Sequence, residues 1–397
     1  MSSTTKGNSI AISGMFFMLG LCFGSLSSRM ATVKGGLSLS DGVFGSVLFA
    51  MSAGVVLSLP VSGWAIARFG SRVVGVAAIV TNVVLLSLIP FASNVHELAI
   101  LLFISGFSYS AVNVSNNTQA SISEAITGKT RIPFFHGIWG LAGFVGAGIG
   151  ALMMSGDVSL SLHFLLISVI ALVSTLIGWR FLHRKPELEQ AGRAFAMPDK
   201  PLLNYGLIVL CSMACEGIMY DWTSVYFQDV VAADQSFVGL GFAVFMGAMT
   251  VGRLLLNRVV DRVGMRRTLQ WSGMLALAGI TMTILSPGLV SSIIGFCLVG
   301  LGICTVIPLA AGAAAKSTTM APSAAIASVL TIGFMGTLAG PPLIGFLSDA
   351  FGLRYAFIVC AILAIGITYR AGKIPVQSRS LKVAPGIDDL RRADKRS

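Results

Sequence analysis

Long apolar runs, separated by short polar segments, make up most of this chain. Many runs pass about twenty residues without a charge, which is the length that crosses a hydrocarbon core ~30 Å thick. The pattern predicts twelve spans, at residues 9–30, 42–66, 73–92, 98–120, 132–154, 160–181, 202–227, 237–257, 268–286, 289–314, 324–347 and 354–371. The sequence therefore predicts an all-α membrane protein with twelve transmembrane helices.

One polar segment is longer than the others. It lies between the sixth and seventh predicted spans and reads FLHRKPELEQAGRAFAMPDKP. Charges and prolines at this density are typical of a linker. We predict an N-terminal six-helix bundle at 1–181, a cytoplasmic linker at 182–201, a C-terminal six-helix bundle at 202–371 and a disordered basic cytoplasmic tail at 372–397.

The two predicted bundles repeat one another. The segment GWAIARFGSRVV follows the second span, and LNRVVDRVGMRRTL follows the eighth. Gly70 and Gly264 hold matching places in these segments, at an offset of 194 residues. Two parallel six-helix repeats joined by an inside linker are the layout of one large class of transporter. We therefore expect two pseudo-symmetric bundles.

The composition is that of a chain whose solvent is mostly lipid. Charged residues make up 11%, whereas a soluble domain carries roughly 25%. The net charge is +11, but the basic residues lie between apolar runs without interleaved aromatic side chains, which argues against a nucleic-acid surface. They gather in the segments that are inside if both termini are cytoplasmic, as the positive-inside rule requires. We expect a multi-pass protein with cytoplasmic N- and C-termini.

The sequence gives no indication of an enzyme, a cofactor or a metal site. All six cysteines fall inside apolar runs, without the spacing of a zinc site or of a disulfide framework. The chain has no GxxxxGK[ST] phosphate loop and no soluble domain to hydrolyse a nucleotide, which argues against a primary pump. The energy for transport is therefore expected to come from a gradient.

The loop after the eighth predicted span resembles a recurring loop of the major facilitator superfamily. It reads Asp261-Arg262-Val-Gly264-Met-Arg266-Arg267, and the glycine-rich eleventh span, with Gly340-Pro341-Pro342, resembles another recurring element. The N-terminal copy of the loop departs from the pattern, because Ala67 precedes Arg68 where the superfamily usually has an aspartate. The resemblance covers nearly the whole chain and implies the major facilitator fold.

A narrower set of motifs resembles the bacterial YbjJ-type branch of that superfamily, which lies near the fucose permeases. The motifs are Asn117-Thr-Gln119-Ala120, Glu124, Gly128, Phe135-His136-Gly137, Glu216-Gly217 and Asp221-Trp222. This resemblance implies a carrier of the cell inner membrane.

Glu216 is the strongest candidate for chemistry. At ~1.5 Å per residue it lies roughly 21 Å along the seventh span from Leu202, somewhat past mid-membrane. A carboxylate is costly there unless it is paired, protonated or facing water, and intramembrane acids often carry protons. We predict that Glu216 couples transport to protons. The alternative is a protonated acid that only hydrogen-bonds between helices.

Amide, imidazole and phenol groups are candidate contacts for a solute. Asn113 and Asn117 share one face of the fourth span, where amides suit a hydroxyl-rich or zwitterionic solute or else join helices. His136 opens the fifth span, where it relays protons, contacts the solute or serves a structural role. Tyr220 lies one turn from Glu216 and is expected to stack on a sugar-like ring or to bond the carboxylate. The alternative for Tyr220 is an interfacial aromatic belt.

Two pairs of charges are candidate gates. Arg29 ends the first span, and the repeat offset places it close to the equivalent of Asp221. We predict that they form an ion pair that closes the outer mouth; the alternative is two unrelated interfacial charges. On the inside, Asp261 and Arg262 are expected to bond helix-end backbone groups and neighbouring basic side chains, and so to lock the inside face until the solute binds. The alternative is that these charges only set the orientation of the chain.

The prediction is thus a secondary active transporter that couples protons to a small polar metabolite, for example a sugar-like one, by rocking of two helical halves. Its partners are the solute, protons and the lipid bilayer, without nucleic acid, and we expect a monomer. Two alternatives stay open. One is a proton-driven exporter of an amphipathic compound, and the other is a membrane sensor that binds a solute without moving it.

Overall fold

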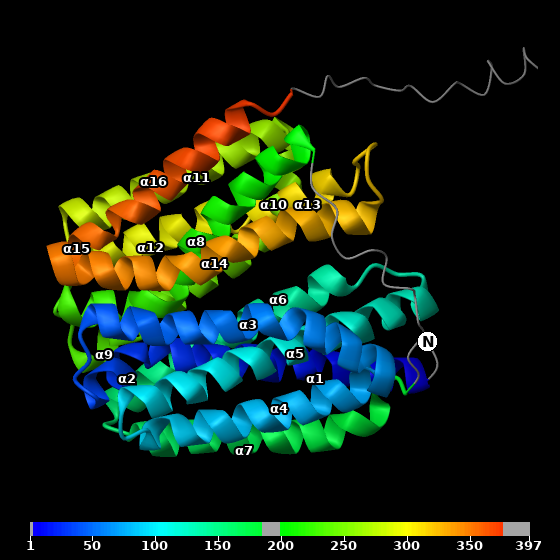
Figure 1. Ribbon diagram of the computed structural model, residues 1–397, viewed down its shortest axis with the longest axis horizontal. Coiled ribbons are helices and arrows are strands. Elements are labelled where there is room, and N and C mark those ends of the chain that lie inside the picture. Colours follow the sequence, from blue (N-terminus) through cyan, green and yellow to red (C-terminus); the bar gives the residue numbers. More distant parts are fainter. Residues whose placement is uncertain (1–2, 185–198, 376–397) are drawn as a thin grey trace, which may run out of the picture.

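The computed structural model describes residues 3–184 and 199–375, and the helices in them follow the predicted spans (Figure 1). Twelve helical stretches of this part of the chain are long and apolar enough to cross a membrane, which confirms the prediction. In chain order the helices are α1 (Ser3–Ser28), α2 (Met30–Gly36), α3 (Asp41–Phe69), α4 (Ser71–Leu88), the 3-10 helix η1 (Ile89–Phe91), α5 (Val95–Thr127), α6 (Ile132–Ser155), α7 (Leu160–Gly178), the 3-10 helix η2 (Trp179–Phe181), α8 (Lys200–Asp229), α9 (Gln235–Val238), α10 (Leu240–Val263), α11 (Met265–Leu285), α12 (Leu289–Ile303), α13 (Val306–Ala314), α14 (Pro322–Phe351), α15 (Leu353–Ala356) and α16 (Ile358–Gly372).

Local signals fix where the helices begin and end. The Asn94 side chain accepts a bond of 3.0 Å from the backbone N–H of Glu97 and so starts α5, because the first N–H groups of a helix lack partners within it. The same helix runs to Thr127, beyond the predicted end at residue 120. It stops at Gly128, whose φ of 62° is left-handed and whose N–H bonds the carbonyl of Glu124. The span prediction missed this extension because the added turns are polar.

The helices form two six-span bundles with the same internal packing. In the first bundle α1 packs along α6, α3 along α5 and α4 along α7. The equivalent spans of the second bundle make the equivalent pairs, α8 with α14, α10 with α12 and α11 with α16. Figure 1 shows the first bundle in blue to green and the second in green to red, side by side. The predicted pseudo-symmetric architecture is therefore confirmed.

Two glycines carry the repeat into the backbone geometry. Gly70 has φ 82° and ψ 148°, and Gly264 has φ 83° and ψ 158°. Both join one transmembrane helix to the next, and nothing lies within 4 Å of a Cβ added at either position. The glycine is therefore required by the dihedral angles rather than by space, because side chains rarely adopt a φ near 80°.

The two bundles meet along α3 with α14 and along α6 with α10. We call the side where α1 begins and α3 ends, at Phe69, the N-terminal face, and the side where α3 begins, at Asp41, the opposite face. The contact of α3 with α14 is tight near the opposite face, where a Cβ added to Gly45 would lie 2.9 Å from the carbonyl oxygen of Pro341. Close approach of the backbones thus holds the halves together at this end.

Most of the predicted linker (182–201) and tail (372–397) lies outside the described residues. At the start of the linker, His183 is held against the first bundle, because its N–H and carbonyl both bond the Gln119 side chain, at 2.9 and 3.0 Å. At its end, Asp199 caps α8 by accepting a bond of 2.9 Å from the N–H of Leu202.

Candidate functional site

Glu216 is buried in α8 and has two polar neighbours. The Tyr220 hydroxyl, one turn later on α8, donates a hydrogen bond to Glu216 Oε1. From α10, Nη2 of Arg253 lies 3.4 Å from the same oxygen. The other carboxylate oxygen, Oε2, is buried without a hydrogen-bond partner among the described residues. The acid is therefore paired but not fully satisfied.

Arg253 is the residue that the sequence analysis missed. It lies inside the eighth span, Gln235–Leu256, where a charge is as costly as the one at Glu216. The rule that selected Glu216 would also have selected Arg253, had it been applied to basic residues inside spans. The side chain of Arg253 is 24% exposed and that of Glu216 is 10% exposed, so Arg253 is the more accessible partner of the pair.

Aromatic rings gather around Tyr220, which bonds Glu216. The Phe23 ring from α1 lies 4.9 Å from the Tyr220 ring in an edge-on contact, measured between centroids. On its other sides Phe23 contacts Tyr109 at 5.5 Å and Trp139 at 5.7 Å, both from the first bundle, and Phe242 at 5.9 Å from the second. Phe23 thus joins the aromatic side chains of the two bundles beside the charged pair.

A chain of amide and imidazole groups lies in the first bundle. The Asn117 side-chain N–H donates to Asn113 Oδ1 at 2.7 Å and to the Asn113 carbonyl at 2.9 Å. Asn117 Oδ1 lies 3.0 Å from His136 Nε2. An amide oxygen only accepts, so His136 donates from Nε2. Three of the predicted solute contacts therefore form one network, although sequence alone did not connect His136 to the asparagines.

The contact of α6 with α10 brings the ion pair and the amide and imidazole network to the same boundary between the bundles. His136 lies on α6, and Gly140 one turn later faces α10, where a Cβ added to it would be 2.8 Å from Thr250 Oγ1. Thr250 lies one turn from Arg253 on the same helix. We call Glu216, Tyr220, Arg253, Phe23, Asn113, Asn117 and His136 the central site. It combines one acid, one base, amides and aromatic faces at the boundary of the halves.

The predicted ion pair between Arg29 and Asp221 is wrong for this structure. Arg29 Nη2 donates to the Val158 carbonyl at 2.9 Å, within the first bundle, and no ion pair within 4.0 Å joins it to Asp221 in the described part of the chain. The helix is interrupted at this point, because α1 ends at Ser28 and Arg29, with φ −107° and ψ 8°, is the residue before the short α2.

Lys34 of α2, rather than Arg29, forms an ion pair with the second bundle. Its Nζ lies 2.7 Å from an oxygen of Asp229 in α8 and 2.5 Å from an oxygen of Asp41 in α3. Burial alone lowers the pKa of Lys34, but the hydrogen bonds and charges of these two carboxylates outweigh burial and raise it. Lys34 therefore links the halves at the opposite face.

Asp261 and Arg262, the predicted inner gate, lie in the last turn of α10, at the N-terminal face. Both side chains are exposed. They stand apart from the central site along the helix, since Arg253 precedes Asp261 by about two turns.

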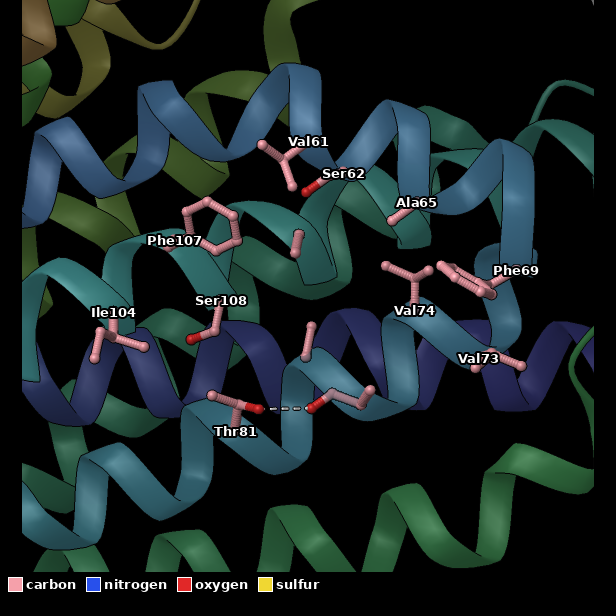
Figure 2. Close-up of a pocket in the computed structure, with 13 residues that line it drawn as sticks. Val61, Ser62, Ala65, Phe69, Val73, Val74, Thr81, Ile104, Phe107 and Ser108 are labelled. Atoms are coloured by element: carbon pink, nitrogen blue, oxygen red, sulfur yellow. Dashed lines mark hydrogen bonds between the residues drawn. The ribbon is translucent and has the colours of Figure 1, made fainter.

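A groove opens at the surface of the first bundle, outside the central site. It measures about 350 Å³ and is lined by α3, α4 and α5, with Phe69, Val73, Ile104 and Phe107 among its walls (Figure 2). The hydroxyl groups in its wall have partners in their own helices, as in the bond of 3.0 Å from Thr81 to the Ala77 carbonyl drawn in Figure 2. The rest of its lining is apolar, so few groups are left to recognise a polar solute. Metal-binding groups of three or more histidine, cysteine or acidic side chains are also absent from residues 3–184 and 199–375.

The fold and the membrane-buried polar site define an integral membrane protein of the transporter class. The sequence model of the Major Facilitator Superfamily matches residues 12–321 and 206–384. The chain belongs to the major facilitator superfamily.

Relatives and solved structures agree with this family. The chain is 31% identical over 357 residues to an uncharacterised MFS-type transporter of Yersinia pestis, covering 90% of this chain and 93% of the relative. It is 29% identical over 362 residues to the membrane protein MosC of Rhizobium meliloti, covering 90% and 87%. The fold is similar to that of a point mutant of the nucleoside transporter NupG, with a TM-score of 0.79, 12% identity and coverage of 92% and 99%. It is also similar to a bacterial homologue of the lysosomal transporter Spinster in an inward-facing, unoccupied conformation, with a TM-score of 0.72, 12% identity and coverage of 94% and 97%.

Proposed function

We propose that this protein is a secondary active transporter that couples protons to the movement of a small polar metabolite. The observation that carries the proposal is the membrane-buried pair of Glu216 and Arg253, which faces the amide and imidazole network of the other half. An acid and a base at this depth are costly for stability alone, so their presence favours a functional role. The protein works as a monomer in the cell inner membrane, with both termini cytoplasmic.

Glu216 is the proposed proton carrier. Tyr220 and Arg253 contact its Oε1, and its Oε2 has a free lone pair for a proton. Protonation removes the attraction to Arg253 and so changes the contact between α8 and α10. A change of this kind at a helix contact is what links a proton to a conformational equilibrium.

The contacts between the bundles at the opposite face support alternating access as the mechanism. Close backbone contact of α3 with α14 and the Lys34 ion pairs favour a state that is closed at the opposite face. With cytoplasmic termini, this state is closed to the outside. Rocking of the two bundles about the central site would break these contacts and expose the site there.

The solute is proposed to lie between the ion pair of the second bundle and the amide and imidazole network of the first. Asn113, Asn117 and His136 supply donors and acceptors from the first bundle. Arg253 supplies donors from the second bundle, and the Tyr220 oxygen supplies an acceptor, since its hydroxyl hydrogen is donated to Glu216. The ring faces of Phe23 and Tyr109 suit a solute with a ring-shaped body. These same rings favour the second candidate, a proton-driven exporter of an amphipathic compound.

A screen followed by flux measurement tests the proposal. Purified protein is heated with a panel of small metabolites, and solutes that raise the unfolding temperature are kept, because a ligand stabilises the state it binds. Each is then offered to proteoliposomes with and without a pH gradient. We expect gradient-driven accumulation, its loss in Glu216→Gln, and retained solute exchange in that variant.

Glu97→Gln is the matched control, because Glu97 is an exposed acid at the first turn of α5. It should accumulate solute as the wild type does. Binding without accumulation in the wild type would instead identify a sensor, and full accumulation by Glu216→Gln would remove Glu216 from the coupling role.

A further inference from the structure

We infer that the solute carries a carboxylate, which binds Arg253 when Glu216 takes up a proton. This inference rests on the proposed function and names the class of solute for the same site. The geometry of Arg253, the charge balance of the central site and the shape of its aromatic wall each point to such a group.

Arg253 has hydrogen-bonding capacity left over. A guanidinium has five N–H donors, and its ion pair uses one nitrogen, at 3.4 Å from Glu216 Oε1. Charge-assisted bonds between arginine and carboxylate are commonly about 2.7–2.9 Å long and often bidentate. The contact is therefore single and long, and Arg253, whose side chain is 24% exposed, has donors left for a second carboxylate.

The charge balance makes proton and anion depend on each other. Glu216 and Arg253 are the two formally charged side chains of the central site. The other titratable groups that face the pair are Tyr220 on α8, Tyr109 on α5, His136 on α6 and Cys304 at the end of α12. None of these carries a fixed negative charge near neutral pH. Protonation of Glu216 thus leaves Arg253 as an uncompensated charge in the membrane, which is unfavourable. A carboxylate on the solute restores neutrality.

This arrangement binds one proton and one monovalent anion together. The proton enters on the unpartnered Oε2 of Glu216, and the anion accepts hydrogen bonds from Arg253. No net charge is added to the site. The deprotonated site, where Glu216 already neutralises Arg253, has no comparable attraction for an anion. Uptake of the anion therefore requires the proton, which is how the pair couples the two.

The side chains near the ion pair indicate the shape of the rest of the solute. Phe23 and Tyr220 are in ring contact next to Glu216, which the Tyr220 hydroxyl bonds, so the body next to the carboxylate is expected to be planar or apolar. The Asn113 and Asn117 network on the other half suits a hydroxyl group at the far end. The class is a small monocarboxylate with a ring-shaped body.

Benzoate and benzamide test the inference, because they share a ring and differ in charge. Each is titrated calorimetrically into the full-length protein in lipid nanodiscs. In Glu216→Gln, Arg253 has lost its carboxylate, and we expect benzoate to bind roughly 10-fold or more tightly than in wild type, as for a charged hydrogen bond. Benzamide should bind both proteins equally. The double variant Glu216→Gln with Arg253→Gln should lose the gain for benzoate.

Equal effects on benzoate and benzamide would overturn the inference, and so would a benzoate gain that persists in the double variant, since the anion would then bind elsewhere.

Wild-type protein gives a second measurement that needs no variant. Benzoate, but not benzamide, should bind more tightly as the pH falls from neutral while benzoate itself stays ionised. Benzoate binding of this kind without any gradient-driven flux would refute the transport function and leave the anion site standing. Gradient-driven flux of a neutral solute, together with equal binding of benzoate and benzamide, would support the transport function and refute the anion site.

Discussion

Lys34 and Asp229 are joined by an ion pair of 2.7 Å across the boundary between the two halves. They lie 195 residues apart, almost the offset of the sequence repeat, so the two bundles contribute opposite charges from nearly equivalent places. The same lysine binds Asp41, and Ser348 of the second bundle donates a hydrogen bond to that aspartate. Charged and hydroxyl groups thus connect α2, α3, α8 and α14 at the opposite face.

Removal of Lys34 should loosen this face. A cysteine at position 224 can report the opening, because Ser224 is buried and bonds the Ser27 carbonyl and the Ala31 N–H across the boundary, at 3.2 and 3.3 Å. In a background without native cysteines, Lys34→Gln is expected to speed labelling of Ser224→Cys roughly twofold to fivefold, since a partly exposed ion pair contributes about 0.5–1 kcal/mol. The rate of thiol labelling in membranes measures this.

Arg29→Gln is the control for that experiment. Arg29 lies close to Lys34 in the chain but bonds Val158 within its own bundle, so its removal should leave the labelling rate unchanged. Faster labelling in Arg29→Gln than in Lys34→Gln would show that Arg29 holds the face closed after all.

The effect of Lys34 should also depend on pH in one direction. Its folded-state pKa is raised above the ordinary 10.5 by Asp229 and Asp41, against the effect of burial. A raised pKa contributes stability that is fully present below the unfolded pKa and is lost as pH rises through the folded pKa. The ratio of labelling rates between Lys34→Gln and wild type should therefore stay constant from neutral pH to about 10.5 and approach unity above it. A ratio that already falls near neutral pH would contradict this.

Gly70 and Gly264 should be sensitive to a single methyl group. Gly70→Ala and Gly264→Ala each force a side chain into a backbone conformation that costs about 1–3 kcal/mol, and we expect a lower unfolding temperature for both. Gly63→Ala is the matched control, because Gly63 lies inside α3 and also has nothing within 4 Å of an added Cβ. It should be neutral or slightly stabilising, as alanine favours a helix. Equal losses at all three positions would contradict the role of φ.

Physical constraints that act on single segments made the fold predictable. Lipid excludes charges and unpaired backbone groups, so apolar length alone located the twelve spans. The repeat was visible as matching glycines, and these adopt matching dihedral angles. Helix ends were less predictable, as at α5, because a polar turn outside the membrane can still be helical.

Side-chain pairs between helices were not predictable in the same way. The repeat offset led to Arg29 and Asp221, but an offset matches positions along the chain and carries no information about the interruption of the helix at residue 29. Glu216 and Arg253 lie 37 residues apart on different helices, so no periodicity connects them. The hydrogen bond of Tyr220 to Glu216, one turn apart on one helix, was within reach of sequence reasoning and is confirmed.

Asn117 should matter for solute affinity rather than for stability alone. Asn117→Ala removes the group that connects Asn113 to His136, and binding of a transported solute should weaken by about 1–3 kcal/mol if the amide contacts it. Asn82→Ala is the control, because Asn82 is a buried amide of α4 that bonds the Ser105 carbonyl at 3.3 Å. It should lower stability and leave affinity unchanged. Unchanged affinity in a folded Asn117→Ala protein would assign this amide to helix packing.

Glu216 and Arg253 should show strong energetic coupling, because each leaves the other as a buried or half-buried charge when it is removed. Glu216→Gln and Arg253→Gln are each expected to lower the unfolding temperature at neutral pH, and the double variant should lose much less than the sum of the two losses. Coupling of contacting charges is commonly about 0.5–3 kcal/mol, and breaking a buried pair is worse than removing both charges.

The single variants should also respond differently to pH. In Arg253→Gln the remaining acid can be neutralised by a proton, so mild acid should restore stability to this variant. The arginine left in Glu216→Gln stays charged at any accessible pH, so no such recovery is expected there. Additive losses, or equal recovery in both variants, would show that the 3.4 Å contact carries no functional charge pairing.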